Sequence, residues 1–122
     1  MKLQLALAPG MKFFTAHGSG YVMVNGARFE KPLIVTPERV LPDWPAQDFA
    51  ALEESHFASL LELKPEVVLL GTGQKLRFPH PRLYRQLTDA RISVECMDTP
   101  AACRTYNILA SEHRRVVAAI LL

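Results

Sequence analysis

The most constraining feature of the chain is a run of four large apolar residues, Val67 to Leu70, that follows Pro65 and ends at Gly71-Thr72-Gly73. Two of the four are β-branched, and neither face of the run carries a polar side chain. This pattern is typical of a strand in a parallel sheet, where helices exclude water from both faces. The run therefore predicts a strand in the interior of a sheet.

Two further apolar runs, residues 92–97 and 116–122, follow this strand, and each comes after a segment with helical spacing. The first such segment opens at Pro81. The second runs from Thr99 to about residue 112, with Thr99 as the expected N-cap and a proline at the first helical position. Strands joined in this way lie parallel and cross over right-handedly. The second half of the chain is therefore predicted to form a strand-helix-strand-helix-strand unit.

The first half of the chain carries the signals of antiparallel strands. Residues 13–17 are β-prone, and Tyr21–Val24 is followed by Asn25-Gly26 and a second β-prone run at 27–30. Asn-Gly between two such runs is the strongest short-range signal of a hairpin, because both residues tolerate the positive φ of a type I′ turn. We therefore expect residues 21–24 and 27–30 to pair.

Residues 33–36 and 39–41 predict two more strands, which the neighbouring prolines should confine to short or edge positions. Residues 48–63 have the spacing of one helix face, capped by Asp48 or restarting at Ser55. The predicted fold class is thus α/β: a single three-layer domain over residues 1–122, with a mixed central sheet and an N-terminal antiparallel β-hairpin layer. Residues 1–10 are expected to form an edge strand or a loose tail.

The composition is that of an ordinary globular protein. The 122 residues are 49% apolar and 21% charged, so a packed core is expected without a disulfide or metal staple. The net charge is +2, and no basic motif with interleaved aromatics accompanies it, which argues against nucleic-acid binding. No apolar run reaches the ~18 residues of a membrane span. Together with two cysteines that we interpret as free thiols, Cys96 and Cys103, this predicts a soluble, cytoplasmic protein.

The Gly71-Thr72-Gly73 exit is the first candidate site. It leaves the carboxyl end of a buried strand, where open α/β sheets bind ligands, and its backbone N–H groups could bind an anion together with Lys75 or Arg77. The dinucleotide-binding pattern needs a third glycine and an immediate helix, and both are missing here. The competing interpretation is a tight strand exit that needs glycine for its dihedral angles.

The last helix carries the second candidate. Four polar residues fall near one line, and this face either forms hydrogen bonds or is simply solvated. The start of the helix should meet the glycine exit at one edge of the sheet, while Tyr106 should point inward. The predicted ligand-binding residues are therefore Gly71, Thr72, Gly73, Arg104, Thr105 and Asn107. Cys103, near the helix start, is either a thiol of lowered pKa or a small buried residue, and we expect burial.

No residue pattern indicates catalysis. The four histidines show no metal-ligand spacing, and Gly18-Ser19-Gly20 lacks the spacing of a nucleophile elbow. No catalytic residue, metal or cofactor is therefore predicted.

Three segments resemble a known family: Gly20–Gly26, Pro65–Gly73 and Met97–Glu112, the last followed by Arg114 and Val116. They look like the domain-of-unknown-function family that includes mitochondrial complex I assembly factor 3 and the adipogenesis-associated domain-containing protein. The resemblance covers residues 13–122 and implies a three-layer α/β domain without an established reaction, so no catalytic residue carries over. The chain has no Arg-rich mitochondrial presequence and so resembles a short bacterial member.

Two functional hypotheses follow. The first is a non-enzymatic protein-interaction or complex-assembly factor, as the resemblance implies, with exposed apolar residues near the hairpin or the rim of the predicted pocket as its contact surface. The alternative is a small-ligand or anion-binding domain, an enzyme included, with its pocket at the carboxyl end of strand 67–71. Fold alone does not decide between them.

Overall fold

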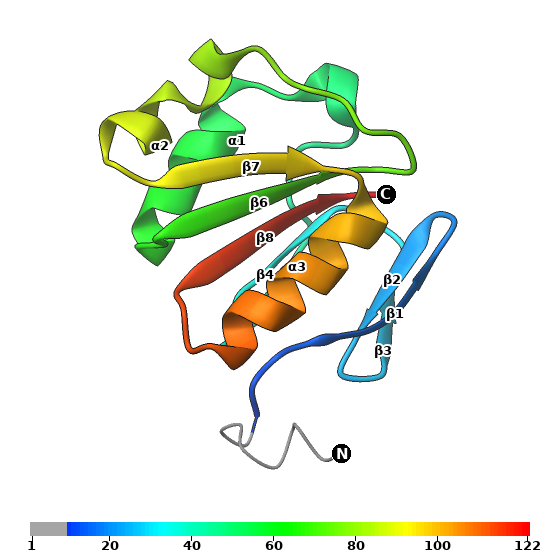
Figure 1. Cartoon of the computed structure of the whole chain (residues 1–122). Helices are drawn as coiled ribbons and strands as arrows, with labels where there is room; N and C mark the ends of the chain where they lie inside the picture. Colours follow the sequence, from blue (N-terminus) through cyan, green and yellow to red (C-terminus); the bar gives the residue numbers. More distant parts are fainter. Residues whose placement is uncertain (1–9) are drawn as a thin grey trace.

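The computed structural model describes residues 10–122, so the edge strand or tail predicted for the first ten residues lies outside the described part, Gly10 excepted. Two sheets form (Figure 1). The five-stranded sheet has the order β5-β4-β8-β6-β7, and the three-stranded sheet has the order β1-β2-β3. Their strands are β1 (Phe14–Gly18), β2 (Tyr21–Val24), β3 (Ala27–Phe29), β4 (Leu33–Val35), β5 (Val40–Pro42), β6 (Val67–Thr72), β7 (Ser93–Met97) and β8 (Val116–Leu121).

The helices cover both faces of the larger sheet. They are α1 (Glu54–Ala58), α2 (Arg85–Asp89) and α3 (Thr99–Ser111), with short 3-10 turns η2 (Phe49–Ala51), η3 (Ser59–Leu63) and η4 (Pro81–Tyr84). In Figure 1, α1 and α2 lie on one side of this sheet, and α3 lies on the other, between it and the small sheet. This arrangement is the predicted three-layer α/β fold with its antiparallel β-hairpin layer.

The predicted parallel half of the sheet is confirmed. β6 pairs in parallel with β7 on one side and with β8 on the other, and all six of its residues are buried. Its side chains alternate between two cores. Val67 and Leu69 pack with α3 and the small sheet, whereas Val68 and Leu70 pack with α1, η3 and α2. An unbroken apolar run is therefore what this position requires.

The predicted hairpin is also confirmed. β2 and β3 pair antiparallel around Asn25 and Gly26, whose φ angles are 49° and 85°. Positive φ at both central residues is the geometry that Asn-Gly favours.

One strand lies deeper than its prolines suggest. β4 is short, as predicted, but it is not at an edge: it pairs with β5 on one side and with β8 on the other, and all three of its residues are buried. Pro32 and Pro37 both fall outside the three paired residues. Their missing N–H groups therefore remove no hydrogen bond from the ladder, and the strand is free to occupy the interior.

The predicted helix at 48–63 is broken into three pieces. Asp48 caps only the short η2 turn, accepting the Ala51 N–H at 2.9 Å. Glu53 has an extended backbone and is the N-cap of α1. Its own N–H donates to His56 Nδ1 at 3.0 Å. Two competing caps within six residues thus divide a segment whose apolar spacing is otherwise continuous.

The cap of α3 also differs from the prediction. Asp98, not Thr99, is the N-cap, and its carboxylate accepts the Ala101 N–H at 2.8 Å. Thr99 is the first helical residue and is buried. Its hydroxyl is consequently available for contacts with the sheet.

The small sheet is fastened to α3 by polar contacts as well as by apolar packing. The Asn107 amide accepts the Phe14 N–H at 2.9 Å and donates to the Phe14 carbonyl at 2.8 Å. The hydroxyl of Tyr106, which points inward as predicted, donates to the Lys12 carbonyl at 2.9 Å, and its ring lies 5.2 Å from that of Phe14. The Asn107 side chain therefore pairs with both backbone groups of Phe14, as a residue of a neighbouring strand would.

We expect Asn107→Ala to lower the free energy of unfolding by about 1–3 kcal/mol, because it leaves two partly buried backbone groups of Phe14 without partners. Urea denaturation measures the change. Ser111→Ala is the matched control: it removes a hydroxyl bonded only to the helix carbonyl of Ile108, and should change stability by less than about 0.5 kcal/mol. Equal stability of Asn107→Ala and the wild type would contradict this role.

Candidate functional site

The exit of β6, the end of β8 and the start of α3 meet at one edge of the larger sheet, as predicted. The Thr99 hydroxyl accepts the Gly73 N–H at 2.9 Å and donates to the Leu121 carbonyl at 2.6 Å. In return, the Thr99 N–H donates to the Gly73 carbonyl at 2.8 Å. A single buried threonine therefore ties three elements together at this edge, which we call the carboxyl rim.

The two glycines of the exit serve different purposes. A Cβ at Gly71 would lie 2.9 Å from both Ile120 Cδ1 and Thr99 Oγ1, so only glycine permits this close approach. Gly73 has a φ of +93°, in the region that favours glycine. The tight-exit interpretation thus accounts for both residues.

The polar groups of this exit are largely paired within the protein. The buried Thr72 hydroxyl donates to the Lys75 carbonyl at 2.6 Å and accepts the Arg77 N–H at 3.2 Å. The N–H of Gly73 is held by Thr99 rather than turned to solvent. The structure therefore brings Gly71, Thr72 and Gly73 together with Thr99, although Thr99 was expected only as a cap.

The predicted ligand residues on α3 differ in their exposure and in their hydrogen-bond partners. Arg104 is exposed and Thr105 is half-buried, while the Asn107 amide faces β1 and is used by Phe14. Of the two interpretations of this polar face, hydrogen bonding is therefore correct at Asn107. A ligand held by Gly71, Thr72, Gly73, Arg104, Thr105 and Asn107 stays a prediction.

The loop of residues 74–80, which follows the rim, carries two exposed apolar residues; exposed apolar residues near the rim were expected, but these two were not singled out from the sequence. Leu76 and Phe78 are 52% and 72% exposed, the latter the most exposed large apolar side chain among the described residues. One sequence signal could have identified them: two large apolar residues, separated by Arg77, lie in a segment that predicts neither helix nor strand. Such residues have no element of their own to bury them.

This loop is held in place along its length. Its beginning is held by the Thr72 hydroxyl, and Gln74 Nε2 donates to the Gly18 carbonyl of β1 at 3.3 Å. The Arg77 guanidinium lies 5.5 Å from the Phe49 ring centroid, and Pro79 is buried. The exposed positions of Leu76 and Phe78 are therefore imposed by the surrounding contacts.

Neither cysteine is activated. Cys103 is buried, as predicted, and burial raises the pKa of its thiol to about 12, although the charge of Arg104 acts in the opposite direction. Burial also raises the pKa of half-buried Cys96, and the nearby Glu95 adds to this shift. Within residues 10–122, no three histidine, cysteine, aspartate or glutamate side chains gather to hold a metal ion. The described helices include none with the length and apolar character needed to cross a membrane.

Comparison with known proteins identifies a family and a solved structure that match most of the chain. A family model described as a protein of unknown function, DUF498/DUF598, matches residues 14–121. A protein from Bordetella parapertussis has a crystal structure that superposes with a TM-score of 0.87 at 42% identity, over 93% of this chain and 98% of that one.

Two curated relatives have informative names. The 13 kDa major membrane protein of Francisella tularensis is 32% identical over 99% of both chains. The bovine NADH dehydrogenase [ubiquinone] 1 alpha subcomplex assembly factor 3 is 31% identical, over 93% of this chain but only 62% of its own length. Because one relative is named as a membrane protein, the cytoplasmic location of this chain stays a prediction.

We expect Thr99→Val to lower the free energy of unfolding by at least about 1–3 kcal/mol. Valine keeps the shape of threonine but leaves the buried Gly73 N–H and Leu121 carbonyl without their partner. Chemical denaturation tests this against Thr88→Val, which removes an exposed hydroxyl bonded to the Arg85 carbonyl of the same helix. If both variants lose the same amount, Thr99 does not hold the rim together.

The thiol pKa values predict protection from labelling. In a Cys96→Ser variant at pH 8, Cys103 should react with Ellman's reagent only after unfolding, because it is buried and its pKa of about 12 leaves almost no thiolate. This raised pKa also means that its contribution to stability is complete below pH ~9 and is lost as the pH rises toward ~12. Rapid labelling of the native variant would show an accessible thiol and refute the assignment.

Proposed function

Because the chain belongs to the DUF498/DUF598 family, we propose that it is a non-enzymatic protein-interaction domain that helps to assemble a larger complex. The family match confirms the resemblance drawn from the sequence, and several relatives are named as assembly factors of NADH dehydrogenase. The chain spans only 62% of the length of the bovine member. We propose subunits of an NADH dehydrogenase as the first candidates for its partner.

The observation that carries this proposal is the exposure of Leu76 and Phe78 on a loop that is already fixed. A large aromatic side chain left 72% exposed gains free energy when a partner covers it, and aromatic residues are frequent anchors of protein interfaces. Since the loop is held by Thr72, Gln74 and Pro79, little further ordering is needed when it binds.

The charge of the loop indicates the kind of partner surface. Lys75 and Arg77 lie beside the two apolar residues and are both exposed. A partner that offers an apolar pocket with acidic residues around it would match this arrangement, because complementary charge at an interface rim guides association and orientation. The Arg77 side chain is itself positioned by the Phe49 ring.

We expect the double variant Leu76→Ser, Phe78→Ser to lose a partner that the wild type retains when tagged proteins are purified from the source organism. The matched control is Ile108→Ser, which removes an apolar side chain of similar exposure, 58%, from α3. Both variants should melt within a few degrees of the wild type, because they remove exposed groups only.

A photo-crosslinking residue at position 78 should also form an adduct with that partner, and the same residue at position 108 should not. Retention of every partner by the loop variant, or equal crosslinking from both positions, would overturn the proposal.

A further inference from the structure

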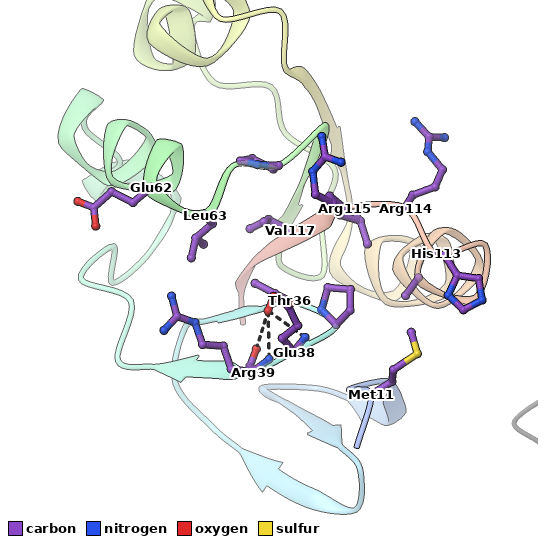
Figure 2. A pocket seen from close by; sticks show the side chains of 14 residues that line it. Met11, Thr36, Glu38, Arg39, Glu62, Leu63, His113, Arg114, Arg115 and Val117 are labelled. Atoms are coloured by element: carbon purple, nitrogen blue, oxygen red, sulfur yellow. Dashed lines mark hydrogen bonds between the residues drawn. The ribbon is translucent and has the colours of Figure 1, made fainter. Parts of the chain in front are cut away.

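A cavity of about 400 Å³ lies at the edge of the sheet opposite the carboxyl rim (Figure 2). It opens where β6 and β8 begin and α3 ends, about 20 Å from the rim by the length of a six-residue strand. The buried residues Ala110, Val116 and Val117 line it, together with charged side chains from three segments. In Figure 2 the charged residues surround the opening, and Val117 lies near the middle of the view.

The turn that carries Arg39 is organised by one buried threonine. The Thr36 hydroxyl accepts the N–H groups of Glu38 at 3.2 Å and Arg39 at 3.1 Å, and lies 3.2 Å from the Arg39 carbonyl. These are the dashed lines in Figure 2. The Thr36 N–H also donates to the Arg39 carbonyl at 2.9 Å. The backbone of Arg39 is thus fixed, while its exposed guanidinium forms no ion pair with any residue in the range 10–122.

The end of α3 places a second ionisable side chain at the opening. The N–H groups of His113 and Arg114 donate to the carbonyls of Ala110 at 2.9 Å and Leu109 at 3.2 Å, which forms a Schellman motif. His113 has a φ of 62° at the position of this motif that glycine usually fills. Histidine adopts this positive φ less readily than glycine does, and its imidazole lines the cavity.

The two arginines that follow are only partly neutralised. Glu66 accepts the Arg115 backbone N–H at 2.8 Å and lies 3.6 Å from Arg114 Nε. The Nε of Arg115 donates to the Lys64 carbonyl at 3.1 Å, which leaves its terminal amino groups without a carboxylate among the described residues. Glu62 also lines the cavity, but its carboxylate is turned away from the arginines in Figure 2. Glu38 is a second lining glutamate, so the opening carries three arginines against two glutamates and has a net positive charge.

We propose that this cavity binds a small molecule that carries one carboxylate or phosphate group on an apolar body. A volume of about 400 Å³ lies in the range of small-molecule sites, which combine an apolar lining with a few polar groups that fix orientation. The apolar body would lie over Met11, Pro37 and Leu63, which line the cavity and are only half-buried. Arg39 and Arg115 would receive the anionic group, since guanidinium groups bind carboxylates and phosphates through paired hydrogen bonds.

Four probes with the same chain and different head groups test the proposal: octanoate, octyl phosphate, 1-octanol and octylamine, each titrated into the ¹⁵N-labelled protein and followed by NMR. Octanoate or octyl phosphate should produce saturable shifts of the Ala110, Val116 and Val117 amides, and the tighter of the two identifies the anionic group. 1-Octanol and octylamine should bind at least about tenfold more weakly, the loss expected when a charge-assisted hydrogen bond is missing.

Arg39→Gln should weaken binding of the better anion by about tenfold or more, whereas Arg85→Gln, an exposed arginine on α2, should leave it unchanged. Both variants should keep the wild-type melting temperature. Equal binding of 1-octanol or octylamine, no binding of either anion, shifts centred on the 74–80 loop, or equal effects of the two substitutions would each overturn the proposal. None of these results depends on whether the loop binds a protein.

Discussion

The structure depends on the burial of β6 and β8 on both faces. All six residues of each strand are buried, and alternate side chains enter separate cores. A sheet with two apolar faces is stable only when both are covered. The short helices α1 and α2 cover one face, and α3 covers the other. The small sheet follows from the same requirement, because its residues Phe14, Val22 and Val24 share the core on the α3 side.

The two edges of this sheet differ because their backbone polar groups are satisfied in different ways. At the carboxyl rim, Gly71 allows α3 to approach closely and Thr99 pairs the groups of the two strand ends. That edge is closed by internal hydrogen bonds, and the chain leaves it as an exposed loop. At the amino edge, a cavity remains between the end of α3 and the Thr36 turn. One edge thus carries an exposed apolar loop and the other a cavity.

The sequence predicted those features that local rules determine. The Val67–Leu70 run and the Asn25-Gly26 turn each contain their whole signal within a few residues, and the structure agrees with both. The break of the 48–63 segment was expected only as one of two alternatives, because apolar spacing does not report which of two N-caps begins the helix. The function of Asn107 could not be resolved because its partner, Phe14, is 93 positions away. The cavity was invisible for the same reason: four separate segments line it, and none contains a recognisable motif.

The small sheet also links the polar face of α3 to the exposed loop. β1 is held at its beginning by Asn107 and ends at Gly18, whose carbonyl accepts from Gln74 of the loop. A short strand of five residues therefore joins the helix fastening to the segment that carries Leu76 and Phe78. Two hydrogen bonds and one aromatic contact hold β1 to α3, and a third hydrogen bond holds Lys12 just before it. The position of the loop therefore depends on polar contacts whose geometry is directional. Apolar packing alone would keep the small sheet attached but would fix its orientation less narrowly, so the polar residues of α3 help to position the loop without being part of it.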